Sequence, residues 1–214
     1  MTELVTYSLR DGVATLRLDD GKANALSLAM SEAIGAGLDR AAGDARVVVI
    51  RGRPGVLCGG FDLKVIRAGD AAARVAMVEA GMALLGRLYL LPQPLVIACT
   101  GHAVAAGGLM LLTADIRIGL RGDFRIGLNE TAIGLSLPQA GIELARDRPI
   151  PGALTEATLR ARLYGPDDAA RVGYLDAAED GGGFDDAVAR AVEELSRLDA
   201  AAFAATKQRL REGK

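Results

Sequence analysis

The chain has 214 residues, of which 50% are hydrophobic and only 4% aromatic, which is enough for one sizeable core of mainly aliphatic side chains. Lysine and arginine number 25 against 27 acidic residues, so no excess of positive charge is available to neutralise nucleic acid or an anionic membrane. We therefore expect a single domain, residues 1–214, that binds neither of these partners.

Two features of the sequence bear on the cellular compartment in which the protein is expected. Cys58 and Cys99 lie in apolar or glycine-rich sequence, and the N-terminus lacks the pattern of a signal peptide, which favours a reducing cytoplasm. Residues 88–114 carry no charge, but Pro92 and Pro94 and several glycines would break a membrane helix. A buried strand followed by a buried helix is the expected explanation of this segment.

The first 60 residues predict strands that alternate with a helix. Residues 5–10 and 13–18 alternate between polar and apolar on either side of Asp11-Gly12, which predicts a hairpin. Ser27 is the expected N-cap of a helix that runs to about residue 42. A buried strand at 47–50 and a glycine-rich loop at 53–60 follow.

The same alternation continues through the middle of the chain. A helix is predicted at 71–91, a strand at 95–99 and another strand at 115–119. Between these strands, the glycine-rich turn at 101–108 enters a short apolar helix. Strands and helices at this spacing predict an α/β fold with a largely parallel sheet.

The remainder of the chain is predicted to be mostly helical. We expect 1–137 to form a sheet-rich core and 138–214 a helical C-terminal part. The run Gly181-Gly182-Gly183 is interpreted as a loop before helices at 185–198 and 200–210.

Two segments share one form: a buried strand, a glycine-rich turn and a helix whose first amides lack partners. They are residues 58–63 and 105–109. Such amides suit an anion or a developing oxyanion, and in a parallel sheet these turns gather at the carboxyl ends of the strands. The alternative is that the glycines only let helices pack close to strands.

Residues 53–63, 101–115 and 126–134 resemble three successive signatures of the crotonase (enoyl-CoA hydratase/isomerase) family. Further similarity lies in residues 22–26, in 169–176 and at Thr206-Lys207, so the resemblance covers nearly the whole chain. It implies an α/β fold of repeated ββα units in two roughly perpendicular sheets with a helical C-terminal region. It also implies an acyl-CoA substrate, no cofactor beyond the coenzyme A of the thioester, and a homotrimer or a dimer of trimers.

The C-terminal part is shorter than in typical members of the family. The chain ends at Lys214, soon after Thr206-Lys207, where typical members continue with another helical stretch. We expect a more open acyl pocket as a result.

The resemblance places the two oxyanion donors on the backbone N–H groups of Phe61 and Ala106. Together they would hold the thioester oxygen as an enolate forms, and loss of one such donor costs about 3–4 kcal/mol in the transition state. The family usually has glycine where this chain has Ala105-Ala106.

The catalytic carboxylates decide which reaction is expected. Of the two glutamates that hydratases of this family use, the first falls on Leu109 and the second on Glu130. One carboxylate suffices to move a double bond from a 3-enoyl to a 2-enoyl thioester, whereas water addition asks for two groups. Residues 127–131 also resemble the delta-3, delta-2-enoyl-CoA isomerase subgroup, and apolar neighbours should raise the proton affinity of Glu130. An ordinary surface glutamate is the alternative.

The remaining substrate contacts follow from the resemblance. They are Lys22, Ala23, Ala25, Leu57, Cys58, Gly59, Gly60, Gly107, Leu109 and Leu135. Lys22 and Lys64 are candidates for the phosphates of coenzyme A, with solvated surface lysines as the alternative.

Other polar and apolar residues favour structural roles. His102 is interpreted as structural, Asp62 as a helix cap, and no cluster of residues has the spacing of a metal site. A core role is expected for Met77, Met82, Leu84, Leu85 and Leu88, with part of this set lining an acyl tunnel. Alternative functions are an enoyl-CoA hydratase, an acyl-CoA hydrolase or decarboxylase of the same fold, and a catalytically silent CoA-binding protein.

Overall fold

The computed structural model describes residues 3–149 and 151–212, so Lys214, at which the chain ends, lies outside the described residues. The predicted hairpin is confirmed, because β1 (Val5–Arg10) pairs antiparallel with β2 (Val13–Leu18). Asp11 and Gly12 form its turn with φ of 50° and 75°, the backbone that a tight two-residue hairpin turn requires.

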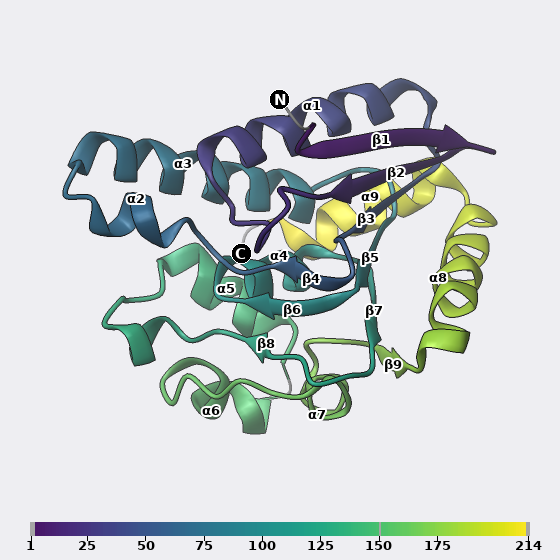
Figure 1. The fold of residues 1–214 in the computed structure, drawn as a ribbon. Coiled ribbons are helices and arrows are strands. Elements are labelled where there is room, and N and C mark those ends of the chain that lie inside the picture. Colours follow the sequence, from purple (N-terminus) through teal and green to yellow (C-terminus); the bar gives the residue numbers. More distant parts are fainter. Residues whose placement is uncertain (1–2, 150, 213–214) are drawn as a thin grey trace.

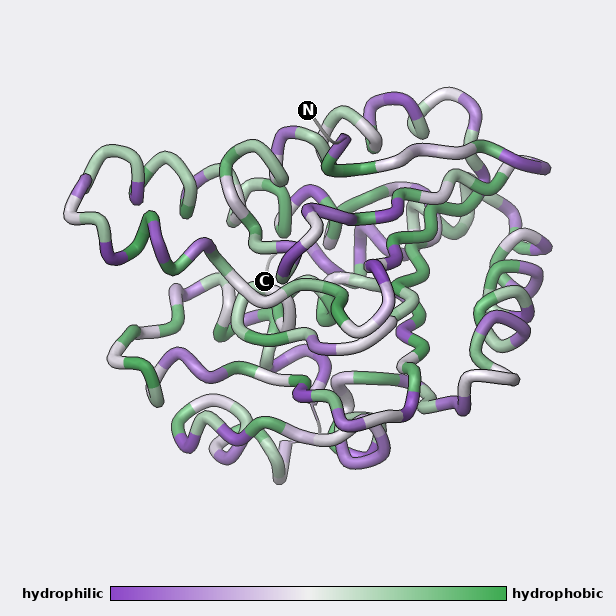
Figure 2. Tube along the Cα trace, in the orientation of Figure 1, coloured by the Kyte–Doolittle hydropathy of each residue, from purple (hydrophilic) through white to green (hydrophobic). Residues whose placement is uncertain are grey.

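The hairpin opens a six-stranded sheet with the order β1-β2-β3-β5-β7-β9, in which every pair after the first is parallel. Its other strands are β3 (Val47–Arg51), β5 (Leu95–Cys99), β7 (Ile116–Leu120) and β9 (Ala177–Glu179). The central strands are buried on both faces, and Figure 2 shows their hydrophobic colouring. The edge strand β9 comes from the part of the chain predicted to be mostly helical.

A second, three-stranded parallel sheet has the order β4-β6-β8. Its strands are β4 (Gly55–Cys58), β6 (Gly101–Val104) and β8 (Ile126–Gly127). The predicted loop at 53–60 and the predicted turn at 101–108 were therefore wrong in part, because each contains a short strand. Glycine is what lets these strands meet: a Cβ on Gly101 would lie 2.0 Å from the Gly55 carbonyl carbon.

Helices surround the two sheets (Figure 1). As predicted, Ser27 caps α1 (Leu28–Asp44) by accepting from the Met30 N–H at 3.1 Å. α3 (Ala71–Tyr89) ends two residues earlier than predicted, since Pro92 disfavours helical backbone at the residue before it. The others are α2 (Leu63–Arg67), α4 (Ala106–Thr113), η1 (Glu130–Ile133), α5 (Gln139–Asp147), η2 (Pro151–Ala153), α6 (Leu154–Thr158), α7 (Pro166–Val172), α8 (Gly181–Ser196) and α9 (Ala200–Arg211).

The interpretation of Gly181-Gly182-Gly183 as a loop was wrong, because these glycines form the first turn of α8. The Gly183 and Phe184 N–H groups both donate to the Asp180 carbonyl, at 2.9 and 3.0 Å. α8 packs its apolar face, which begins at Phe184, against the outer face of the large sheet (Figure 1). This tertiary packing extends the helix through residues of low helix propensity.

The C-terminal helix α9 is anchored by buried charges. Asp115 accepts from Lys207 at 2.6 Å and from Arg211 at 2.7 Å, and both cations are 5% exposed. Burial lowers the pKa of Lys207 to about 8 although Asp115 opposes the shift. The uncharged residues 88–114 run through β5, β6 and α4, and within the described ranges no helix is both long and apolar enough to cross a membrane.

Candidate active site

The small sheet brings three of the predicted residues to one edge. Phe61 follows β4 by three residues, Ala106 follows β6 by two, and Glu130 follows β8 by three. Since the three strands are parallel and adjacent, their carboxyl ends lie together, on the side of η1 and α2 in Figure 1.

The two glycine-rich turns touch each other at this edge. Gly60 has φ of 98°, and a Cβ there would lie 3.0 Å from the Ala105 Cβ and 3.7 Å from the Ala106 nitrogen. The Leu26 N–H donates to the Gly60 carbonyl at 2.8 Å and fixes the first turn. Among residues 3–149 and 151–212, neither the Phe61 N–H nor the Ala106 N–H has an acceptor, so both remain available to a ligand.

Ala105 adopts an unusual backbone conformation in the second turn. Its φ of 54° and ψ of −121° are those of the first central residue of a type II′ turn, where glycine is preferred. The turn is held by the Ala105 N–H, which donates to the Gly127 carbonyl at 2.9 Å, and by the Leu109 N–H, which donates to the Ala105 carbonyl at 3.0 Å. Such a conformation costs roughly 1–3 kcal/mol, and it sets the direction of the Ala106 N–H.

Glu130 is the first residue of η1 and is only 8% exposed. Its Oε2 atom is buried and has no hydrogen-bond partner in the described part of the chain. Burial raises the pKa of Glu130 above the ordinary value, although the backbone amides of Glu130 and Asn129 oppose the shift. The predicted effect of desolvation on this carboxyl group is therefore confirmed in direction.

Glu130 lines a cavity of about 450 Å³, which we call the acyl cavity after the role that the family resemblance implies for it. Its lining is Phe61, Ile66, Arg74, Val75, Val78, Glu79, Leu109, Glu130, Leu135, Ser136 and Pro138. Leu109 is 1% exposed, so the position of the first hydratase glutamate is a buried apolar side chain.

Sequence reasoning missed the contribution of α3 to this cavity. Arg74, Val75, Val78 and Glu79 lie on one helical face, and this spacing was the only signal that could have singled them out. The predicted set Met77, Met82, Leu84, Leu85 and Leu88 does not line the acyl cavity, and its expected part in an acyl tunnel stays a prediction. Instead, Met77, Leu84, Leu85 and Leu88 are buried on other faces of α3, and Met82 lines a separate cavity with Leu85.

A second cavity of about 450 Å³ shares Phe61 with the acyl cavity. Its lining includes Lys22, Ala23, Ala25, Gly59 and Lys64, all from the predicted set. One of the proposed oxyanion donors, Phe61, therefore belongs to the lining of both cavities.

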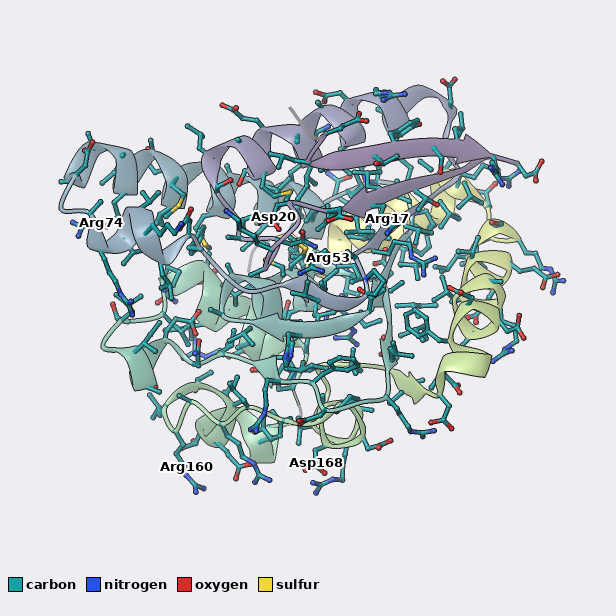
Figure 3. The ribbon with its side chains drawn as sticks, viewed as in Figure 1. Arg17, Asp20, Arg53, Arg74, Arg160 and Asp168 are labelled. Atoms are coloured by element: carbon teal, nitrogen blue, oxygen red, sulfur yellow. The ribbon has the colours of Figure 1, made fainter. Side chains whose placement is uncertain are left out.

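The loop beside the second cavity is rigidly held. The Asp20 carboxylate accepts from the Lys22 N–H at 2.7 Å and from the Asn24 N–H at 2.9 Å. The Arg53 Nε atom donates to the Lys22 carbonyl at 2.8 Å. Figure 3 labels Asp20 and Arg53 in the middle of the molecule and Arg74 at the far end of the α2 and α3 helices.

Comparison with known proteins decides the family. A family model described as enoyl-CoA hydratase/isomerase matches residues 8–213. The chain belongs to this family.

Relatives within the enoyl-CoA hydratase/isomerase family carry both names. A probable enoyl-CoA hydratase of Rhodobacter capsulatus is 31% identical, with 98% of this chain and 81% of the relative covered. A crystal structure of a family protein from Pseudomonas syringae is 42% identical with a TM-score of 0.95, and the match covers 98% of this chain and 91% of that one. Human mitochondrial delta3-delta2-enoyl-CoA isomerase is 27% identical with a TM-score of 0.94, covering 98% and 83%. The predicted crotonase fold is confirmed.

Five residues predicted from the enoyl-CoA hydratase/isomerase resemblance line neither cavity: the proposed donor Ala106, which is fully buried, and Leu57, Cys58, Gly60 and Gly107. A Cβ on Gly107 would lie 2.1 Å from the Cys58 carbonyl oxygen, so this glycine allows α4 to pack on β4. Burial raises the pKa of the Cys58 thiol to about 11, which suits an inert core residue. Gly107 and Cys58 therefore support the backbone of the two glycine-rich turns and do not line a cavity.

His102 and Asp62 have the structural contacts that their sequence context predicted. The His102 Nδ1 atom accepts from the Arg125 N–H at 3.0 Å, and its ring meets Phe124 edge-on with centroids 5.5 Å apart. His102 lines neither cavity. Asp62 caps α2 by accepting from the Lys64 N–H at 2.8 Å.

Proposed function

We propose that this chain is an enoyl-CoA isomerase that moves the double bond of a 3-enoyl-CoA to the 2 position. One observation carries the proposal: the acyl cavity contains a single buried carboxylate, Glu130, while the buried Leu109 occupies the position of a second. This apparatus can move a proton, but it offers no second buried group to activate a water.

The reaction begins with the thioester carbonyl between the Phe61 and Ala106 N–H groups. Glu130 takes a proton from C2, and the C2–H electron pair delocalises through the C3–C4 double bond and the carbonyl as a dienolate. The two N–H groups stabilise the negative oxygen, an arrangement worth about 3–4 kcal/mol per donor. Glu130 then returns the proton to C4, the double bond forms between C2 and C3, and no water is consumed.

The second cavity suits the coenzyme A portion of the substrate. Lys22 and Lys64 line it and supply positive charge for phosphate groups. Because this cavity and the acyl cavity share Phe61 in their linings, we place the thioester that joins the two portions of the substrate beside the Phe61 N–H.

Hydration of 2-enoyl-CoA is a second candidate function, and Glu79 is the observation that favours it. This residue is a second carboxylate in the lining of the acyl cavity. It is exposed at the rim, however, whereas a hydratase needs its second carboxylate where water meets the reacting carbons.

The test is to assay the purified protein with 3-enoyl-CoA and with 2-enoyl-CoA, beside a Glu130→Gln variant. The proposal expects conversion of 3-enoyl-CoA to 2-enoyl-CoA, little 3-hydroxyacyl-CoA from either substrate, and loss of conversion in the variant. An unreactive 3-enoyl-CoA, or an equally active variant, would show the proposal to be wrong.

A further inference from the structure

Another cavity borders the segment that follows Glu130. It has a volume of about 410 Å³, and we call it the distal cavity. Apart from Ser136, Arg146 and the threonines 131, 155 and 158, its lining consists of Leu137, Ile142, Leu154 and Leu159. The Thr131 Oγ1 atom donates to the Leu159 carbonyl at 3.1 Å, and this bond ties η1 to the end of α6 (Figure 1). The distal cavity therefore lies beside η1, the element that carries Glu130.

The distal cavity and the acyl cavity share one lining residue, Ser136. A serine side chain extends only one heavy atom beyond Cβ, so the two cavities approach each other within the width of one small residue. The start of η1 is arranged in the same way, since Glu130 lines the acyl cavity and the next residue, Thr131, lines the distal cavity. A flexible chain that leaves the acyl cavity past Ser136 would therefore enter the distal cavity.

The chemistry of the distal cavity suits a hydrocarbon. Its Thr131 hydroxyl is bound to the Leu159 carbonyl, and its Thr158 hydroxyl donates to the Leu154 carbonyl at 2.7 Å. Arg146 is exposed, so its guanidinium can stay in water while its hydrocarbon stem lies along the cavity. The described lining contains no carboxylate. A hydrocarbon chain fits these surroundings because it asks for no hydrogen bond.

The charges of the acyl cavity favour the same direction for the chain. On α3, the cavity is lined by Arg74 and Glu79, which are both exposed. A hydrocarbon chain laid along that helix would take water away from two charged groups. On the loop after η1, the cavity is lined by Leu135 and Ser136, and Ser136 leads on to the leucines of the distal cavity.

Both cavities also expose apolar side chains that a ligand would cover. Leu159 is 71% exposed in the lining of the distal cavity, and Leu135 is 39% exposed in that of the acyl cavity. A hydrocarbon chain that ran from one cavity to the other would remove this apolar surface, together with its own, from water.

We propose that the protein takes long-chain acyl-CoA thioesters, whose hydrocarbon chain passes Ser136 and ends in the distal cavity. The inference rests on the proposed function, because it takes the acyl cavity as the site of the reacting carbons. Short acyl chains end inside the acyl cavity. Longer chains gain affinity from each carbon that the distal cavity covers.

The first test measures affinity, with saturated thioesters that have no double bond to move. Titration calorimetry gives the Kd values of butanoyl-CoA and dodecanoyl-CoA for the wild type, Leu159→Asp and Leu210→Asp. The two leucines are 71% and 63% exposed, so neither change should unfold the protein. Only Leu159 lines the distal cavity, and Leu210→Asp is therefore the matched control.

The expected result depends on chain length. The wild type should bind dodecanoyl-CoA about 100-fold more tightly than butanoyl-CoA, which is less than about fourfold per added methylene because the open cavity buries them only in part. Leu159→Asp should weaken the binding of dodecanoyl-CoA by about tenfold, because a carboxylate replaces apolar surface, and leave that of butanoyl-CoA within about twofold. Leu210→Asp should match the wild type with both thioesters.

A second pair of variants tests the same cavity by filling it. Thr155→Phe adds a ring to the lining of the distal cavity, whereas Ala132, which is also exposed, lines neither cavity and gives the control Ala132→Phe. For a twelve-carbon 3-enoyl-CoA, kcat/KM should fall by about tenfold in Thr155→Phe alone, as the buried chain loses space. For a six-carbon 3-enoyl-CoA, both variants should match the wild type.

The outcomes separate this inference from the proposed function. A loss of dodecanoyl-CoA affinity in Leu159→Asp alone supports the inference even if no 3-enoyl-CoA is converted. Equal affinities in all three proteins, or a loss in Leu159→Asp that is the same for both thioesters, would overturn it even in an active isomerase. A lower mass of Leu159→Asp in light scattering, with unchanged preference for chain length, would also overturn it, because the leucine would then lie between copies of this chain.

Discussion

The floor and the rim of the acyl cavity are built in different ways. The floor consists of Phe61, Leu109 and Glu130, which follow the strands of the small sheet or lie in the helix after β6. The rim consists of Arg74, Val75 and Glu79 on α3, and Val75 is 49% exposed whereas Glu130 is 8% exposed. The proposed reacting groups are thus fixed by the backbone pairing of the small sheet, whereas side chains of the rim can change without disturbing that sheet.

The largest effect is expected from removing the base in the floor. Glu130→Gln should lower kcat for 3-enoyl-CoA isomerisation by about 10³-fold, in the range for loss of a general base. KM should change little, because the thioester is held by backbone groups. Steady-state kinetics measure both values, and a kcat within tenfold of the wild type would contradict the assignment.

A smaller loss of kcat is expected when Glu130 is kept but the backbone beside it is displaced. In Gly60→Ala, the added Cβ would meet the Ala105 Cβ at 3.0 Å and the Val104 carbonyl oxygen at 3.1 Å, in a residue with φ of 98°. Displacement of the Phe61 N–H should lower kcat by about 10²-fold, as for loss of one oxyanion donor.

Gly55→Ala is the matched control for this backbone change. Gly55 also has positive φ, at 86°, but nothing lies within 4 Å of its added Cβ. This variant should lose stability without a comparable loss of kcat, as measured by thermal unfolding and kinetics. Equal kcat losses in the two variants would show that strain alone explains the effect.

The pH dependence of kcat/KM should reflect the burial of Glu130 in the floor of the acyl cavity. Because burial raises the pKa of Glu130, the acid limb of kcat/KM should lie above the ordinary pKa of a glutamate, with about tenfold loss per pH unit below it. The effect of pH on the free energy of unfolding has the opposite sign to that of an ion-paired carboxylate. The contribution of Glu130 is fully present below the ordinary glutamate pKa and is lost as the pH rises through its raised native pKa. The Tm should therefore fall less steeply with rising pH in Glu130→Gln than in the wild type. An equally steep fall in both proteins would contradict the account.

Relief of the strained turn should have a modest effect on stability. Ala105→Gly should stabilise the fold by about 1 kcal/mol and raise Tm by roughly 2–4 °C, because glycine tolerates φ of 54°. Ala106→Gly is the control, since Ala106 begins α4 and glycine there should lower Tm instead. A lower Tm in both variants, measured by calorimetry, would show that Ala105 is not strained.

The smallest effect is expected at the rim. Glu79→Gln should change the isomerisation kcat by less than about twofold, because an exposed carboxylate is screened by solvent. Glu143→Gln, which alters a different cavity, is the control. A large loss in Glu79→Gln alone, above all of hydration of 2-enoyl-CoA, would favour the two-carboxylate reaction.

Five of the six strands of the large sheet were predictable from the sequence, because each has a clear local pattern, whereas the edge strand β9 was not predicted. Runs such as 47–50 and 95–99 are apolar and β-branched, and the hairpin around Asp11-Gly12 alternates regularly. The small sheet was not predictable from local pattern, because β4 and β6 have four residues each, begin with glycine, and gain their stability from pairing with each other.

The candidate site was predicted only where a motif marked it. Glu130, Phe61 and Ala106 lie in glycine-rich segments, and the structure brings these segments together at the edge of one sheet. Glu79 lies in a segment without a chemical signature, so its place in the same cavity lining as Glu130 arises from tertiary packing that sequence spacing does not report.

The most direct test of the central claim is to follow the proton itself. A 3-enoyl-CoA that carries deuterium at C2 is converted in a single turnover, and the position of the label in the 2-enoyl-CoA is read by mass spectrometry or NMR. If the buried Glu130 carries the proton from C2 to C4, part of the deuterium appears at C4 of the product. Complete loss of the label to solvent in that first turnover, or its absence from C4 together with formation of 3-hydroxyacyl-CoA, would contradict a single shuttling carboxylate.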